Sequence, residues 1–299
     1  MKKFLLNISA FSAIILALLC IGEVSVRSIP NPYTKKKKAI RDLGKTTETI
    51  VLGSSHSYYG IITDSLENAL NLACVSQIYE YDYRILGKYI NEFPNLKNAI
   101  IVVSYFSFFE PPFERGYWES EIYYKIYLDI DKYPDYSYRN FELSHFESYS
   151  GKLAKKLMNK PLPATSPAGF GLDFRHSNPV TPEAGRDRAE GHSTMPLGYE
   201  AYNRNYFEAL IKTCIERNAT PILITVPAHK HYYEAFNPAQ YERMQLIIKQ
   251  YCNKYGIKHY DFLKDKRFDD ADFYDQDHLC QNGAKKFTRI IKEILSETK

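Results

Sequence analysis

Residues 49–57 read Thr-Ile-Val-Leu-Gly-Ser-Ser-His-Ser. The first four residues are a short, mostly apolar run, and a glycine and two serines follow it. Short, continuously apolar runs are typical of parallel strands that are buried on both faces. Similar runs follow at residues 98–103, 220–227 and 257–262, with a weaker one at 69–73. We therefore expect a buried parallel sheet, one strand of which leads directly into the glycine and the serines.

Helical patterns fill the chain between most of these runs. Apolar residues recur at helical spacing in residues 81–92, 202–217, 241–255 and 283–297. Strands that alternate with helices predict an α/β fold, a three-layer sandwich in which helices cover both faces of a parallel sheet. Ligands of such sheets bind beyond the C-terminal ends of the strands, so residues that follow a strand are the candidates for a site.

The first residues of the chain resemble a membrane anchor. Lys2 and Lys3 precede an uncharged, mostly apolar run over residues 4–22, which Glu23 closes. This run is long enough to cross a bilayer, and the alternative is a cleaved signal peptide. Because no small-residue cleavage site follows the run, we expect a retained signal anchor over residues 1–29, with the rest of the chain outside the cytoplasm.

Two further segments complete the expected organisation. Residues 30–48 carry prolines and then lysines, and we expect a linker there that leads to a domain over residues 49–299. The lysines at 35–38 lie on the far side of the anchor, against the usual preference of positive charge for the cytoplasm. Residues 110–198 interrupt the alternation of strands and helices, and predict an insertion that either covers the site or lies at the periphery.

The composition excludes several classes of function. The 299 residues carry a net charge of +4, without a basic helix or zinc-finger spacing, so we expect no nucleic-acid partner. The chain has no C-x-x-C motif, and we expect neither a metal nor a cofactor. Its 26 tyrosines suit the flat faces of sugar rings, or simply fill a tyrosine-rich core. Cys74 and Cys280 flank the expected site loops, where they form either a disulfide or two buried thiols.

The first candidate motif is the end of the strand at residues 49–52. Gly53-Ser54-Ser55 places a hydroxyl at the rim of the sheet, beside backbone N–H groups at the start of a helix. Such groups stabilise the negatively charged oxygen that forms during acyl transfer. Taken alone, the same three residues are also a common turn.

The second candidate motif precedes the last helix, where residues 272–279 read Asp-Phe-Tyr-Asp-Gln-Asp-His-Leu. Asp275 and His278 are three residues apart, so the carboxylate can meet the imidazole Nδ1 and leave Nε2 free for a serine. Asp277 competes for the carboxylate role, but we expect its side chain to diverge from the adjacent histidine. Taken alone, the pair also fits metal binding or a helix cap.

Together the two motifs resemble the SGNH (GDSL-like) hydrolase superfamily. The resemblance implies a flavodoxin-like parallel sheet, with Ser55 as the nucleophile, Asp275 as the orienting carboxylate and His278 as the base. It also implies a serine esterase or O-acyltransferase. The fuller forms Gly-Ser-Ser-His-Ser-Tyr-Tyr-Gly and Phe-Tyr-Asp-x-Asp-His-Leu are similar to a membrane-anchored branch of bacterial cell-envelope proteins, in the periplasm or at the cell surface.

That branch suggests substrates and partners. Its members work with membrane-bound O-acyltransferases, which makes such an enzyme a possible partner here. The expected substrates are acyl esters, in particular acetyl esters, of extracytoplasmic glycans. The alternative is a catalytically degenerate protein of the same fold that binds envelope glycans or assists a membrane O-acyltransferase.

The chain departs from the superfamily at the positions that bind the oxyanion. The expected glycine after the second strand and asparagine after the third strand are both missing. The amide of Ala73 or Cys74 is the candidate replacement for the glycine, and Ser104 or Tyr105 for the asparagine. Further candidates for binding the oxyanion or the substrate are Ser76 and His229.

Three other polar residues near the expected site each have two interpretations. His56 either contacts substrate or is satisfied by the backbone. Arg188 and His192, in the insertion, either reach the site or lie away from it.

Overall fold

The computed structural model describes residues 1–113, 118–132 and 140–297. Five parallel strands form one sheet in the order β2-β1-β3-β4-β5. They are β1 (Thr49–Leu52), β2 (Ala69–Asn71), β3 (Asn98–Val102), β4 (Thr220–Thr225) and β5 (Lys258–Asp261). Each expected strand is present: β1 has the predicted bounds, and the other four strands are one or more residues shorter than predicted. The order is that of flavodoxin-like sheets, so the expected fold class is confirmed.

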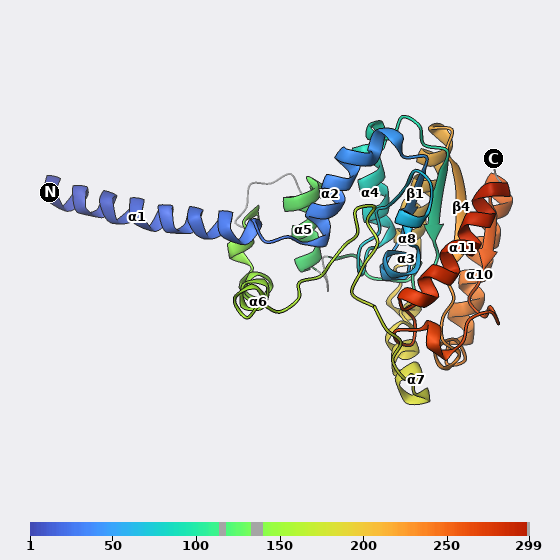
Figure 1. Cartoon of the computed structure of the whole chain (residues 1–299). Helices are drawn as coiled ribbons and strands as arrows, with labels where there is room; N and C mark the ends of the chain where they lie inside the picture. Colours follow the sequence, from blue (N-terminus) through green and yellow to red (C-terminus); the bar gives the residue numbers. More distant parts are fainter. Residues whose placement is uncertain (114–117, 133–139, 298–299) are drawn as a thin grey trace.

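The two faces of the sheet belong to two separate cores. Successive side chains of a strand point to opposite faces. Ile50 and Ile101 therefore contribute to one core, whereas Val51 and Ile100 contribute to the other. Helices cover both faces, which gives the three-layer sandwich (Figure 1).

The first core contains buried residues of α4 (Tyr79–Tyr89), α8 (Glu200–Glu216) and α10 (Pro238–Tyr255), and the second those of α11 (Gln281–Glu297). Shorter elements connect these helices to the strands: α3 (Ser55–Gly60), α9 (Lys230–Tyr233), η1 (Gly44–Thr46), η2 (Thr63–Ser65), η3 (Ile90–Glu92) and η8 (Asp270–Asp272).

The expected linker over residues 30–48 is wrong, because most of it forms helix α2 (Pro32–Leu43) packed on the domain. Asn31 caps the helix: its side chain accepts the amide of Thr34, and the Thr34 hydroxyl accepts the amide of Asn31. Proline at the first helical position completes a strong start signal. Lys36 is fully buried on the inner face, where its ammonium group donates to the backbone carbonyls of Asn71 and Gly169, both at 2.9 Å.

Helix α1 (Lys2–Arg27) projects away from the domain, as Figure 1 shows. Nearly all of its apolar side chains are exposed. Among the described residues it is the single helix that is long and apolar enough to cross a membrane, a test that a signal sequence also passes. The helix is thus a candidate membrane anchor by its length and composition.

The segment between β3 and α8 divides into two parts. The first contains α5 (Trp118–Leu128), η6 (Glu142–Ser144) and α6 (Phe146–Leu157), and lies beside the end of α1. The second contains α7 (Pro182–Gly191) and η7 (Met195–Leu197), and packs on α9. Gly185 allows this packing, because a Cβ there would lie 2.3 Å from the carbonyl oxygen of His231. The second part therefore lies beside the loops that follow the strands.

Candidate active site

The loop after β1 places Ser55 at the start of α3. Gly53 makes the turn with φ of 122°, in a space where a Cβ would lie 2.8 Å from Ser57 Oγ and 3.1 Å from the Cβ of Val102. Only glycine fits such a backbone without strain. The Gly53 amide donates to a carboxylate oxygen of Asp82 at 2.8 Å, which fixes the turn. As the first residue of the helix, Ser55 has an amide with no acceptor within the helix.

Ser55, His278 and Asp275 come together in one hydrogen-bonded row. His278 Nε2 lies 2.8 Å from Ser55 Oγ, and His278 Nδ1 lies 2.9 and 3.0 Å from the two carboxylate oxygens of Asp275. Asp275 also accepts the amides of Asp277 at 3.1 Å and His278 at 2.9 Å. This is the geometry in which a histidine removes the proton of a serine while a carboxylate holds its other nitrogen.

A narrow turn before α11 brings Asp275 and His278 together. Phe273 and Leu279 form an antiparallel bridge, and the amide of Tyr274 donates to the carbonyl of His278 at 2.9 Å. The amide of Cys280 donates to the carbonyl of Asp272 at the same distance. The three-residue spacing therefore spans a hairpin-like turn, with both side chains held on it.

The glycine that follows this turn is required by packing. A Cβ on Gly283 would lie 2.1 Å from the carbonyl oxygen of Asp272, which real structures do not tolerate. We expect Gly283→Ala to lower the free energy of unfolding by about 1–3 kcal/mol, as overpacked cores do. Urea unfolding followed by circular dichroism measures this.

Gly87→Ala is the matched control, because Gly87 is also helical and has open space around its Cβ position. This variant should be as stable as the parent or more so, since alanine favours helix. Equal stability of Gly283→Ala and the parent would contradict the packing at this turn.

Asp277 also contacts His278, so the expectation that its side chain diverges is wrong. One Asp277 oxygen lies 3.3 Å from His278 Nδ1, and the other lies 3.0 Å from His56 Nε2. His56 in turn places Nδ1 2.7 Å from Ser104 Oγ, so side chains and not the backbone satisfy this histidine. Asp277 is thus a buried carboxylate between two imidazoles, since the turn directs both of its carboxylates toward His278.

These contacts set the charges at the site. Burial lowers the pKa of His278, but the carboxylates of Asp277 and Asp275 outweigh it and raise the pKa to about 10. Burial raises the pKa of Asp277, yet His278 and His56 hold it well below its usual range. Burial lowers the pKa of His56 despite its bond to Asp277. His278 therefore takes the charge that pairs with Asp277, and His56 stays neutral.

A cavity of about 370 Å³ opens over Ser55 and His278. Tyr59 and Phe174 line it, and Phe174 stacks between Tyr59 and Tyr274 with ring centroids 3.8 Å apart on both sides. Arg188, Gly191, His192 and Thr194 form part of the lining. The segment 110–198 therefore contributes side chains to the cavity.

Arg188 and His192 both reach the cavity from this segment. Arg188 Nε lies 3.3 Å from an oxygen of Asp277, and its Nη2 lies 3.8 Å from Asp275. His192 donates to or accepts from the Tyr232 hydroxyl at 2.6 Å. The guanidinium group therefore faces the carboxylates that orient the base.

Of the expected oxyanion residues after β2, only Ser76 lines the cavity. It adopts φ of 57°, a conformation that glycine adopts readily and that other residues rarely do. Ala73 is not available, because its amide donates to the side chain of Asn71 at 3.0 Å. Cys74 is buried beneath the loop and does not line the cavity.

The other three candidates also lie outside the cavity lining. Ser104 bonds to His56, and Tyr105 stacks on Phe236 with ring centroids 3.8 Å apart. His229 caps α9 and pairs with Asp270 at 3.1 Å. Ser54 also lines the cavity, and its Oγ is buried with no hydrogen-bond partner among the described residues.

All five cysteines are among the described residues, and all are free thiols. The pairing of Cys74 with Cys280 is therefore not formed. Cys280 donates instead to the carbonyl of Ala271 at 3.3 Å, and burial raises the pKa of Cys74 to about 11.

His56, Asp277 and His278 also form a cluster whose ligand atoms lie within 4.8 Å of one another, close enough to hold a metal ion. The imidazole nitrogens are already used, however: both on His56 and both on His278 lie within hydrogen-bond distance of oxygen atoms of protein side chains. The contacts therefore favour a hydrogen-bonded network of side chains over a metal site at these three residues.

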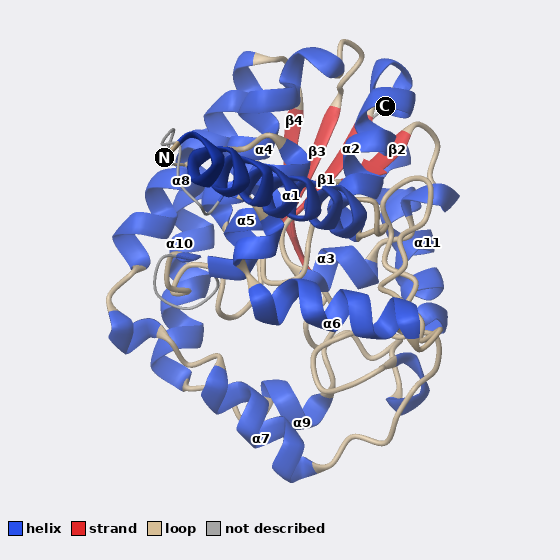
Figure 2. Cartoon of the chain, turned by 90° about the vertical axis from the view of Figure 1, so that its left-hand side faces the viewer, coloured by secondary structure: helices blue, strands red, loops and turns tan. Residues whose placement is uncertain are grey.

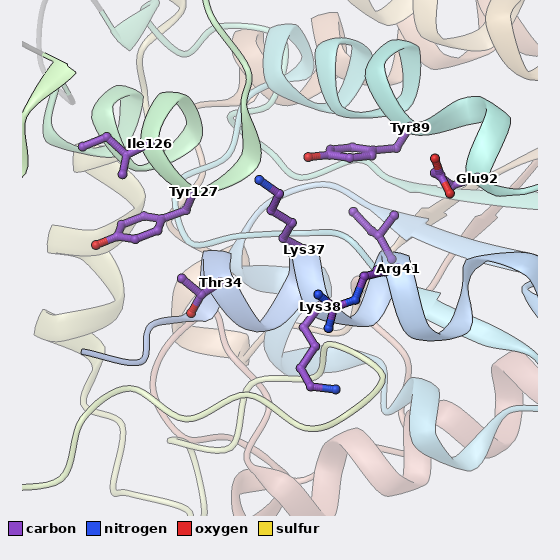
Figure 3. A pocket seen from close by; sticks show the side chains of 9 residues that line it. Thr34, Lys37, Lys38, Arg41, Tyr89, Glu92, Ile126 and Tyr127 are labelled. Atoms are coloured by element: carbon purple, nitrogen blue, oxygen red, sulfur yellow. The ribbon is translucent and has the colours of Figure 1, made fainter. Parts of the chain in front are cut away.

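A second cavity, of about 450 Å³, lies between α2, the end of α4 and α5 (Figure 3). It carries the cations Lys37, Lys38 and Arg41, but no serine or histidine lines it. Lys37 pairs with Asp129 at 2.6 Å, and the other two cations contact Asp42. The lining therefore lacks the nucleophile and base of the first cavity.

The sheet order, the serine after β1 and the Asp-x-x-His turn before the last helix agree with what the resemblance to the SGNH (GDSL-like) hydrolase superfamily implies. Residues 202–296 match the model of a family described as DltD protein. This match runs from α8 to α11, less than half of the chain. No curated protein matches the chain significantly.

Solved structures with a similar course of the chain include three bacterial proteins. One, provisionally described as a platelet activating factor from Streptococcus pneumonia, has 10% identity and a TM-score of 0.41, over 96% of this chain and 99% of its own. A candidate acylhydrolase from Bacteroides fragilis has 9% identity and a TM-score of 0.42, over 87% and 93%. A GDSL-like lipase from Bacteroides thetaiotaomicron has 9% identity and a TM-score of 0.42, over 90% and 100%. These likenesses are distant.

Proposed function

We propose that this protein is a membrane-anchored, extracytoplasmic serine esterase or O-acyltransferase that acts on acyl esters of envelope glycans. The observation that carries the proposal is the hydrogen-bonded row from Ser55 through His278 to Asp275. The aromatic stack beside His278 supports a sugar as one part of the substrate, since flat apolar faces suit sugar rings. The cavity volume suits a small acyl group such as acetyl together with part of a sugar.

The proposed reaction has two half-steps. His278 takes the proton of Ser55 as Oγ attacks the carbonyl carbon of the ester, and then gives it to the departing alcohol oxygen. The acyl group is now esterified to Ser55. In the second half-step a water or a sugar hydroxyl attacks the acyl carbon, its proton passes to His278, and that proton returns to Ser55. Asp275 holds Nδ1–H throughout, so the proton that is taken up and released in each half-step is the one on Nε2.

The oxyanion is the weakest match to the superfamily, and the structure suggests its replacement. The amide of Ser55 is unpaired within its helix, and Ser76 lies at the position after β2 with a positive φ. The free hydroxyl of Ser54 is a third donor beside the same cavity. We propose that these three groups take the place of the missing glycine and asparagine.

A membrane-bound O-acyltransferase is the proposed partner for transfer. It would load Ser55 or receive the acyl group beside the membrane, where α1 would hold the domain. The alternative is a degenerate protein that binds glycans or assists such an enzyme. The observation that favours this alternative is that Ser104, in the expected place of an oxyanion donor, is turned to His56.

Fluorophosphonate labelling of the full chain in detergent separates the two functions. An activated serine should form a stable adduct, and mass spectrometry of the peptide should place that adduct on Ser55 and not on the adjacent Ser54. A folded protein that takes up no label, with or without a candidate partner enzyme, would leave the degenerate binding protein as the better account.

The charges at the site predict a pH dependence. His278 acts as a base only when neutral, and its pKa is raised to about 10, so kcat/KM should rise with pH from neutral into the alkaline range. Asp277→Asn removes the carboxylate that raises this pKa most. The rising limb should then move to lower pH by roughly one unit or more. The measurement is kcat/KM for p-nitrophenyl acetate between neutral and alkaline pH.

Asp270→Asn is the matched control for this profile. Asp270 is exposed and pairs with His229 and Lys230, outside the cavity, so its variant should keep the parent's limb. An unshifted limb in Asp277→Asn would show that Asp277 does not set the pKa of His278.

A further inference from the structure

Helix α1 is fixed to the domain by direct contacts where its apolar run ends. The Glu23 carboxylate accepts the amides of Glu142 at 2.9 Å and Leu143 at 3.0 Å, and it pairs with Arg27 at 2.5 Å. Arg27 donates further to the carbonyl of Asn140 at 2.7 Å. The apolar run over residues 4–22 ends directly before these contacts. On the proposed anchoring, η6 therefore lies at the depth of the lipid headgroups.

Helix α6 follows η6 directly and runs crosswise to α1. Figure 1 shows α6 almost end-on beside the end of α1, whereas Figure 2, turned by 90°, shows it lengthwise across the face from which α1 projects. Helices α1 and α6 are in direct contact. If α1 crosses the bilayer, α6 consequently lies along the membrane surface.

The outer side of this segment is apolar and basic. Four large apolar side chains are exposed: Phe141 by 54%, Leu153 by 38%, Leu157 by 75% and Met158 by 56%. The other large apolar exposures described outside α1 are scattered singly, at Val75, Leu197, Ile215 and Leu246. The concentration of apolar surface beside α1 is therefore specific to this segment.

Charge supports the same orientation. Lys155 and Lys156 are exposed in the last turn of α6. Lys152, one turn before Lys156, reaches into the domain, where its ammonium binds Glu142 and lies 4.3 Å from the ring centroid of Tyr123. Leu153 and Leu157 are therefore on the side away from it, and Lys155 and Lys156 flank that side. A helix whose free side is apolar and is flanked by exposed lysines fits the interface of a bilayer that contains anionic lipid.

We propose that Phe141, Leu153, Leu157 and Met158 insert into the headgroup region of the membrane, while Lys155 and Lys156 contact anionic phospholipid. This membrane-contact surface is a second attachment beside α1, and it rests on the proposed anchoring. Two attachments fix the orientation of the domain over the bilayer, which one helix alone leaves free to rotate.

The test places a single tryptophan in the full-length chain, in a Trp118→Phe background that removes the native one, reconstituted in vesicles of phosphatidylcholine and phosphatidylglycerol with or without bromine on the upper acyl chain. Bromine quenches tryptophan only at close range. Leu157→Trp should lose fluorescence at least about twofold, as expected for a side chain within the interface. Leu246→Trp, at an exposed position on α10 outside the proposed surface, is the matched control and should not change.

Leu16→Trp, within the apolar run of α1, distinguishes the two ways of failing. Quenching at position 16 without quenching at 157 would overturn the membrane-contact surface and leave the anchor in place. Absence of quenching at both positions would overturn the anchor and this inference together. Equal quenching at 157 in vesicles without phosphatidylglycerol would overturn the role given to Lys155 and Lys156.

Discussion

Ser55→Ala is expected to lower kcat for p-nitrophenyl acetate by on the order of 10⁴–10⁶, because the acyl group then has no oxygen to bond to. The hydroxyl of Ser55 is the one that His278 Nε2 contacts at 2.8 Å. Steady-state rates of the purified full chain measure the loss, and the circular dichroism spectrum should be unchanged.

Ser296→Ala is the matched control. It removes an exposed hydroxyl near the end of α11 that donates to the carbonyl of Glu293, so the variant should keep the parent's rate. Turnover in Ser55→Ala within about tenfold of the parent would place the nucleophile elsewhere or show a hydrolysis without an acyl-enzyme.

Asp275→Asn is expected to have the second largest effect, a loss of kcat on the order of 10³–10⁴. An asparagine at this position would keep an oxygen for the amides of Asp277 and His278, so the turn should remain folded. Its NH₂ group would then face His278 Nδ1. The imidazole would carry its proton on Nε2, where it cannot accept the proton of Ser55.

Comparison with Asp277→Asn makes this result decisive. Asp275 contacts Nδ1 at 2.9 Å and Asp277 at 3.3 Å, so Asp275 should orient the ring and Asp277 should mainly set its charge. The expected ranking in kcat at the pH optimum is therefore a large loss for Asp275→Asn and a smaller one for Asp277→Asn. The reverse ranking would assign the orienting role to Asp277.

The fold and the triad were accessible from the sequence because their causes are local. Buried parallel strands leave continuous apolar runs, and the residues that follow them meet at one edge of the sheet. The pair Asp275 and His278 lies on one turn, so its spacing alone brought the two side chains into reach. Ser55 could be predicted as the nucleophile because β1 ends three residues before it, at Leu52.

What the sequence did not predict depends on contacts between distant segments. His56 bonds to Asp277, which is 221 residues away in the sequence. The residues around His56 and Asp277 give no sequence signal for this contact. One missed contact is local: the side chain of Asn71 accepts the amide of Ala73, two residues later, and so excludes it as an oxyanion donor, since asparagine often competes for backbone groups.

The expected linker failed for a different reason. The capping signature of Asn31, Pro32 and Thr34 was present, but the lysines that follow suggested a solvated segment. Lysine is rarely buried fully, and Lys36 is an exception held by backbone carbonyls.

Lys36 also has a consequence for how the chain acquires its structure on the proposed export. Its ammonium needs the carbonyls of Asn71 and Gly169, which lie 35 and 133 residues further along the chain. With α1 retained in the membrane and the rest of the chain following it out, α2 emerges long before residue 169. Until then a buried, unsatisfied ammonium would be too costly, so α2 should stay undocked and protease-sensitive during export. Docking of α2 would therefore report that residues up to Gly169 have emerged and packed on the domain.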